Sequence, residues 1–190
     1  MGSTTAKLKP LSIDGYRKLQ QDAIRAEFHF QMTTCLVATT WERLIDHAKS
    51  YRWKITSLSG TKDNSALVIH KQATESKPEL WVRWNYRNYR RAFRLFLVHH
   101  YGLCNPILPR RLQVDHLYPT SGFTERDRNY FVRLILLDRK INASYGAGFE
   151  RVFYESERER QKNGGIHMDW ITFLKATGTR IPGKNAGEKS

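Results

Sequence analysis

Cysteine is scarce in this chain, which has two in 190 residues, Cys35 and Cys104, far apart in the sequence. Two such residues do not make a zinc site on their own, and there is no Cys-x-x-Cys pair. A single disulfide between them stays open, but nothing in the pattern requires it. We expect two free thiols in a reducing cytosol, and hence a cytoplasmic protein.

Long apolar runs are also missing, so no stretch is long enough to span a bilayer, and we expect no membrane partner. No secretory signal pattern opens the sequence, and we expect no such leader. Internal repeats and a glycine-rich phosphate loop of the nucleotide-hydrolase type are absent too. The length suits one core with an appended subdomain.

Acidic residues are absent from residues 80–114, which carry seven arginines, and the whole chain has a net charge of +14. A phosphate backbone is the polymer that such a basic segment fits best. Basic charge alone also fits membrane surfaces and acidic proteins. We therefore expect nucleic acid, most simply DNA, as the partner.

The first part of the chain, residues 1–79, is predicted to be mainly helical with one small hairpin. Helices are expected over 13–32 and from the capping-box spacing at Thr39–Glu42, and a hairpin is expected over 53–70. Ser76–Glu79 also has capping-box spacing with a proline in the first turn, which predicts a third helix up to Gly102. This region could recognise a substrate or a partner protein.

The third predicted helix carries arginines every three or four residues, which would place them on one face. We expect this face to bind phosphates, because the planar guanidinium donates two hydrogen bonds at once. The alternative is a solvated basic face on a core helix. The residues concerned are Arg83, Arg87, Arg90 and Arg94.

A short apolar strand, Leu112–Val114, ends in the pair Asp115–His116, and Pro119 stops it. An acid and a histidine at the end of a strand can divide two tasks. The carboxylate binds a divalent metal ion, and the imidazole takes a proton from water.

The residues that follow keep to a recognisable order. A polar loop leads to Asn129, Val132–Leu137 forms a second strand, and Asn142 lies where a long helical stretch opens. This order resembles the ββα-metal core of the HNH endonucleases, over residues 112–160. Many members of this family also carry paired Cys-x-x-Cys motifs that bind zinc around the core, and this chain has none.

The resemblance implies an α+β fold in which a two-stranded antiparallel hairpin and a helix form the catalytic core. It implies that His116 is the general base and that Asp115 and Asn142 hold one Mg²⁺ or Mn²⁺ per active site. It also implies that the side chain of Asn129 ties the loop that carries His116. The products would carry 5′-phosphate and 3′-hydroxyl ends. Arg139 and Lys140 would clamp a neighbouring phosphate. The core belongs to a region over 80–176 that ends in a short helix, and a flexible basic tail is expected over 177–190.

Each residue of this set also has a simpler interpretation. Asp115–His116 could be a surface pair, Asn129 a turn residue, and Asn142 an ordinary helix N-cap. Two other function classes also stay open, a non-catalytic nucleic-acid-binding module with a degenerate HNH core and a basic interaction protein. If the chain is a toxin or defence effector delivered into a target cell, an acidic immunity or regulatory protein is the expected partner.

Overall fold

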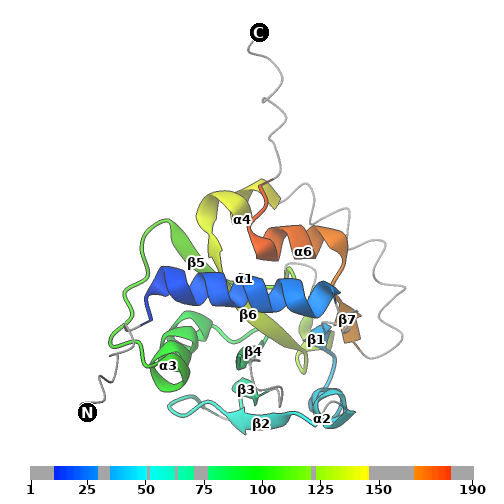
Figure 1. Cartoon of the computed structure of the whole chain (residues 1–190). Coiled ribbons are helices and arrows are strands. Elements are labelled where there is room, and N and C mark those ends of the chain that lie inside the picture. Colours follow the sequence, from blue (N-terminus) through cyan, green and yellow to red (C-terminus); the bar gives the residue numbers. More distant parts are fainter. Residues whose placement is uncertain are drawn as a thin grey trace, which may run out of the picture.

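The computed structural model describes residues 11–29, 35–50, 52–62, 64–70, 77–120, 123–145 and 165–180. They form a mixed α+β structure in which a curled antiparallel sheet is surrounded by helices (Figure 1). The helices are α1 (Ile13–His29), α2 (Trp41–Ser50), α3 (Tyr89–Tyr101), the 3₁₀ turn η1 (Glu125–Asp127), α4 (Arg139–Tyr145) and α6 (Trp170–Thr177). The strands are β1 (Cys35–Ala38), β2 (Lys54–Ser57), β3 (Ala66–His70), β4 (Glu79–Arg83), β5 (Leu112–His116), β6 (Phe131–Asp138) and β7 (Gly165–His167).

Strand β6 organises the sheet, whose strand order is β2-β3-β4-β6-β1-β7. The first residues of β6 pair with β4 on one side and β1 on the other, and its second half pairs with β5. All of its residues except Asp138 are buried, as expected for a strand that is covered on both faces. The sheet also continues across residue 79, so the N-terminal region and the 80–176 region share one sheet.

Side chains in the second half of β6 alternate between two apolar clusters. Leu134 and Leu136 pack in the cluster that contains Phe93 and Phe96 of α3. Ile135 and Leu137 pack in the cluster that contains Phe173 of α6. Burial of each such side chain contributes roughly 1.5–3 kcal/mol to folding.

Helix α1 contributes to both clusters, through Tyr16 at one end and Ile24 further along. Between Tyr16 and Ile24, the side chain of Gln20 pairs with the edge of β6 at Leu136, where no described strand lies beside that edge. Its side-chain Oε1 accepts a hydrogen bond from the backbone N–H of Leu136 at 2.9 Å, and its Nε2 donates to the carbonyl of Leu136 at 3.3 Å. The side chain thus satisfies both backbone groups on the edge of β6 opposite β5, where β4 has ended.

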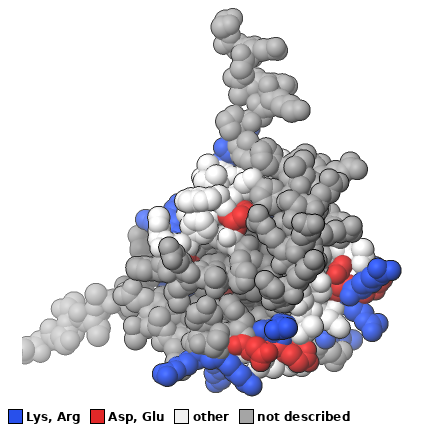
Figure 2. Space-filling model, turned by 90° about the vertical axis from the view of Figure 1, so that its right-hand side faces the viewer, with Lys and Arg blue, Asp and Glu red and all other residues white. Residues whose placement is uncertain are grey.

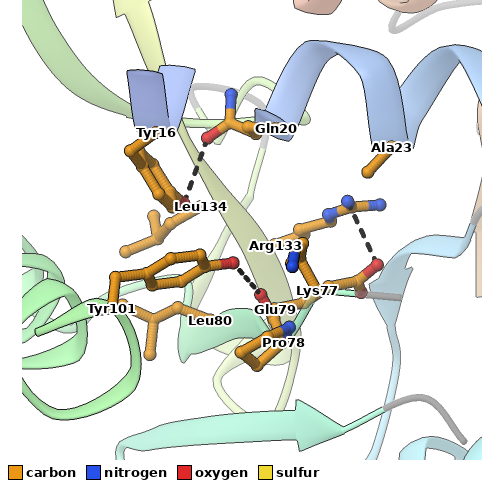
Figure 3. Close-up of a pocket in the computed structure, with 10 residues that line it drawn as sticks. All are labelled: Tyr16, Gln20, Ala23, Lys77, Pro78, Glu79, Leu80, Tyr101, Arg133 and Leu134. Carbon is orange, nitrogen blue, oxygen red and sulfur yellow. Dashed lines mark hydrogen bonds and ion pairs between the residues drawn. The ribbon is translucent and has the colours of Figure 1, made fainter. Parts of the chain in front are cut away.

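A buried charged cluster also ties α1 to the sheet, and Figure 3 shows two of its members, Arg133 and Glu79. The guanidinium of Arg133 lies 2.9 Å from the carboxylate of Glu27 and 3.0 Å from that of Glu79. Burial disfavours the cation, but Glu27 and Glu79 outweigh that effect and raise the pKa of Arg133. A cavity of about 20 Å³ lies beside the cluster, lined in part by Tyr16 and Tyr101. That volume has room for about one water molecule.

Several predicted elements are confirmed. The first helix, the Trp41 helix and the 53–70 hairpin are present as α1, α2 and the β2–β3 pair. The C-terminal short helix is present as α6. The long helical stretch expected from Asn142 extends into residues 146–164, which lie outside the described residues. The tail was expected over 177–190; Thr177 is instead the last residue of α6, and residues 181–190 also lie outside the described residues.

The prediction of one helix from residue 76 to 101 was wrong. Residues 79–83 form strand β4, and the helix begins only at Tyr89. Leu80, Trp81 and Val82 are all buried, because β4 lies between β3 and β6 and is covered on both faces. The end of the helix was correct, since Gly102 adopts φ 63° and caps α3.

Within the described part of the chain, none of the helices has the length and apolar character that crossing a bilayer demands.

Candidate functional site

The pair Asp115–His116 lies at the end of β5, as expected, and β5 pairs antiparallel with β6. Burial alternates along β5, with His116 buried and Asp115 half-buried. Successive side chains of a strand point to opposite faces. The two side chains therefore face different surroundings.

The imidazole of His116 lies on the face of β5 that packs against α3. The residue is 8% exposed, and its ring centroid is 4.8 Å from that of Tyr89, the first residue of α3. Its Nε2 atom is buried and has no hydrogen-bond partner. Burying a polar atom without a partner costs about 1–3 kcal/mol, so such atoms are few in folded proteins and call for an explanation.

Burial is the main cause that lowers the pKa of His116 to about 4. The neighbouring Asp115 carboxylate raises it and the Lys175 ammonium lowers it, both by smaller amounts. At pH 7 the imidazole is consequently neutral and has a lone pair available for a proton.

Asp115 faces α6, and its Oδ2 atom lies 3.5 Å from the Nζ atom of Lys175. The side chain of Lys175 is 5% exposed and that of Asp115 is 26% exposed, so this ion pair is partly shielded from water. Lys175 was not identified from the sequence, because 60 residues separate it from its partner and it lies in an otherwise unremarkable short helix.

Asn142 is the fourth residue of α4, so it is not the N-cap of this helix. The side chain of Asp138 takes the capping role instead, accepting a hydrogen bond from the backbone N–H of Lys140 at 2.8 Å. The Oδ1 atom of Asn142 is buried and has no hydrogen-bond partner. The N-cap alternative for Asn142 is thereby excluded, and its orphaned amide oxygen needs another explanation.

The ladder register fixes where α4 starts relative to His116. Asp138, just before α4, pairs with Leu112, whereas His116 pairs with Leu134. The start of α4 and His116 therefore lie at opposite ends of β5, roughly 13 Å apart at about 3.3 Å per residue. Helix α4 also contacts the end of α6, since the hydroxyl of Tyr145 donates to the carbonyl of Thr179 at 2.9 Å. Lys175 and α4 are thus linked through α6.

A Mg²⁺ or Mn²⁺ ion bound at Asp115 and Asn142 would need hard oxygen ligands. The carboxylate of Asp115 and the partnerless amide oxygen of Asn142 have the right chemistry, while the ammonium of Lys175 is a competing cation at Asp115. Within the described residues, no three His, Cys, Asp or Glu side chains are grouped so that they could hold a metal ion. The expected ligand pair, one carboxylate and one amide, does not need such a group.

The loop between β5 and β6 is held by Asp127. Its carboxylate accepts hydrogen bonds from the backbone N–H of Thr124 at 2.7 Å and from the Thr124 hydroxyl at 3.1 Å. Asn129, to which the sequence assigned the loop-tying role, is exposed in the following turn. The described hydrogen bonds of this loop therefore centre on Asp127.

The four predicted arginines do not share one helix face. Arg83 belongs to β4, where its guanidinium lies 5.5 Å from the ring centroid of Phe131, and Arg87 is exposed in the turn before α3. Arg90 and Arg94 are exposed on α3, as is Arg91, which the prediction had left out. The remaining two candidates, Arg139 and Lys140, are exposed in the first turn of α4.

One arginine of α3, Arg90, lies against the ring that contacts His116. The guanidinium of Arg90 is 5.6 Å from the ring centroid of Tyr89, and that ring contacts His116. On the face in Figure 2, by contrast, acidic and basic side chains are neighbours along the lower edge. The start of α3 differs from this, since no acidic residue lies in its first turn.

Comparison with known proteins gave no match to a family model, to a curated protein or to a solved structure.

Proposed function

We propose that this chain is a metal-dependent endonuclease that hydrolyses DNA phosphodiester bonds. His116 is its general base, and Asp115 and Asn142 hold one Mg²⁺ or Mn²⁺. The observation that carries the proposal is the neutral, partnerless imidazole of His116 beside the exposed arginines of α3. The order of β5, β6 and α4, strand, antiparallel strand and helix, agrees with it.

A phosphodiester resists hydrolysis because its negative charge repels nucleophiles. A neutral imidazole can take a proton from the attacking water, which makes that water a better nucleophile. A pKa of about 4 makes His116 a weak base in the free protein. A phosphate anion beside it would stabilise the imidazolium and raise the pKa toward neutrality. His116 would then become an effective base only when substrate is bound.

The ring of Tyr89 must move for this to happen, because the Nε2 atom of His116 is buried. Tyr89 is half-buried at the first position of α3 and packs against the apolar cluster that contains Phe93 and Phe96. Substrate that binds the adjacent arginines would reach Tyr89 first.

A divalent cation on Asp115 and Asn142 would, when bound, neutralise charge on the phosphate and the leaving oxygen. Asp115 would exchange its contact with Lys175 for that cation. The exposed guanidinium groups of Arg87 and Arg90 would hold the polymer backbone beside His116.

A plasmid-nicking assay with Mg²⁺, with Mn²⁺ and with EDTA tests the proposal. His116→Ala should reduce cleavage by about 10²–10⁴-fold, the usual contribution of a general base. His99→Ala is the matched control, because His99 is an exposed histidine of α3 and should leave cleavage unchanged. Retention of more than a tenth of the activity by His116→Ala would remove His116 from the role.

A second candidate is a nucleic-acid-binding module that does not cleave. The contact between Lys175 and Asp115 favours it, because an ammonium already neutralises the carboxylate that would bind the metal. This candidate predicts DNA binding that is equal with Mg²⁺ and with EDTA, and no nicking at any concentration of Mn²⁺. Metal-dependent nicking that His116→Ala abolishes would exclude it.

A further inference from the structure

The first turn of α3 has no side-chain cap. Asn88 occupies the N-cap position but its side chain makes no capping hydrogen bond. In α6, by comparison, Asp169 accepts a hydrogen bond from the N–H of Thr172 at 2.7 Å. The N–H of Tyr89 donates to the carbonyl of Tyr86 at 3.3 Å. The N–H groups of the next two residues, Arg90 and Arg91, are thus left for another acceptor.

The electrostatics of this turn favour an anion. A helix N-terminus carries a partial positive charge, and no acidic residue lies in the first turn of α3 to offset it. Four exposed arginines surround the turn, and none of them forms an ion pair within the described part of the chain. They are Arg87, Arg90, Arg91 and Arg94.

An independent observation beside this turn also indicates a ligand. His116 is 8% exposed, and its buried Nε2 has no hydrogen-bond partner. Its ring lies against that of Tyr89, the first residue of α3, with the two ring centroids 4.8 Å apart. A single anion at this position would give a partner both to the free N–H groups and, once Tyr89 turns aside, to the imidazole.

We propose that the first turn of α3, together with His116, binds one phosphate group of a nucleic-acid backbone. The backbone N–H groups of Arg90 and Arg91 hold two of its oxygens, as phosphates are held at other helix N-termini. The guanidinium groups of Arg87 and Arg90 reach further oxygens or the next phosphate along the strand. The inference rests on the proposed function only for the identity of the polymer.

This position has a consequence for the proposed chemistry. A phosphate held at the start of α3 displaces the Tyr89 ring and places a negative charge beside His116. The same binding event therefore uncovers the imidazole. Binding of the polymer and activation of the base would be coupled through one side chain.

Amide NMR of the full-length chain, without metal, is the direct test, with inorganic phosphate as the probe. The amide signals of Arg90 and Arg91 should shift saturably with phosphate, and the ring signals of Tyr89 and His116 should shift with them. Sodium chloride at equal ionic strength should produce neither change. Shifts spread evenly over all arginines, or shifts that chloride reproduces, would overturn the proposal.

A pair of variants tests the geometry. Asn88→Asp adds a negative charge at the N-terminus of α3, where it competes with a bound anion, so it should weaken phosphate binding about tenfold. Asn85→Asp adds the same charge at an exposed position three residues earlier and should change binding much less. Equal losses in both variants would show that net charge alone attracts the anion, and the site would be rejected.

The polymer is then tested with short single-stranded and duplex DNA in EDTA, so that binding is measured without cleavage. Asn88→Asp should weaken both relative to Asn85→Asp. An acidic polypeptide such as polyglutamate should bind weakly and be insensitive to Asn88→Asp; the opposite result would replace nucleic acid with a protein partner. Phosphate binding without any metal-dependent nicking would reject the endonuclease proposal but support this phosphate site. Metal-dependent nicking without shifts of the Arg90 and Arg91 amide signals would support the endonuclease proposal but reject this site.

Discussion

The imidazole of His116 is covered by the phenol ring of Tyr89, with the two ring centroids 4.8 Å apart. This contact explains most of what distinguishes His116 from an ordinary surface histidine. The contact lies within the buried surroundings of the ring, and it joins the end of β5 to the start of α3. A base that is weak until its cover moves is protected from protonation in the absence of substrate.

Removal of the cover should restore an ordinary pKa. Burial disfavours the charged imidazolium, so Tyr89→Ala should move the pKa of His116 from about 4 toward its usual value near 6.5. Tyr89→Phe keeps the ring and should keep the low pKa. The measurement is an NMR pH titration of the imidazole proton. A pKa that is the same in Tyr89→Ala and Tyr89→Phe would show that other parts of the core bury His116.

The low pKa also predicts how stability changes with pH. Native His116 remains neutral down to about pH 4, whereas the unfolded chain binds a proton near pH 6.5. The unfolded state thus binds more protons between these values, so the contribution is fully present above pH 6.5 and is lost as the pH falls toward 4. A 2.5-unit shift corresponds to an upper bound of about 3 kcal/mol.

Urea unfolding at pH 7.5 and pH 4.5 measures this contribution. The wild type should lose more stability between these pH values than His116→Gln, which cannot titrate. Comparison of the two proteins cancels the carboxylates that titrate in the same range. Parallel pH profiles for the two proteins would contradict the expectation.

The sequence predicted the β5–β6 pair because its signals are local. Alternation of apolar and polar residues in β5, and the apolar run of β6, are set by side chains that face one core or two. The same logic failed for residues 79–83. Arginines at 83, 87, 90 and 94 recur at helical spacing, but Leu80, Trp81 and Val82 are buried in a strand between two others. Tertiary pairing outweighed a local pattern that fitted a helix.

The candidate site was predictable only in part, for the same reason. The Asp115–His116 pair and its place at a strand end follow from neighbouring residues. The contact of Lys175 with Asp115, and the cover of Tyr89 over His116, join segments that are distant in sequence. The double hydrogen bond of Gln20 to Leu136 is of this kind too, since it spans 116 residues. No local sequence pattern predicts any of these three contacts.

Gln20 gives a sharp test of the fold. Gln20→Leu keeps the size of the side chain but leaves both the N–H and the C=O of Leu136 buried without partners. Each lost partner costs about 1–3 kcal/mol, so the free energy of unfolding should fall by roughly 2–4 kcal/mol. Gln21→Leu, the neighbouring and more exposed glutamine, is the control and should change it by less than about 0.5 kcal/mol. A urea titration measures both, and equal effects would show that the Leu136 bonds are unimportant.

Lys175 provides a test of the metal site that does not depend on cleavage. If a cation binds Asp115, it competes with the Lys175 ammonium 3.5 Å away. Lys175→Met should therefore increase Mn²⁺ affinity, and Asp115→Asn should abolish it. Asn142→Ala should weaken it. Binding can be followed by the paramagnetic resonance of free Mn²⁺, with Lys54→Met, an exposed lysine of β2, as the control. Mn²⁺ affinity that is unaltered in Asp115→Asn would place the metal elsewhere.

The arginines of α3 predict a defined dependence on salt. Each phosphate that a cationic side chain neutralises releases counterions, so log affinity for duplex DNA falls with log salt concentration by about 0.9 per contact. Arg90→Gln should lower this slope by about that amount and weaken binding similarly on unrelated sequences, because backbone contacts position the duplex without reading it. Arg52→Gln removes the same charge at an exposed turn outside this region and should leave the slope unchanged. A slope that Arg90→Gln and Arg52→Gln alter equally would mean that the whole basic surface attracts DNA diffusely, and that α3 has no special part in guiding the backbone to His116.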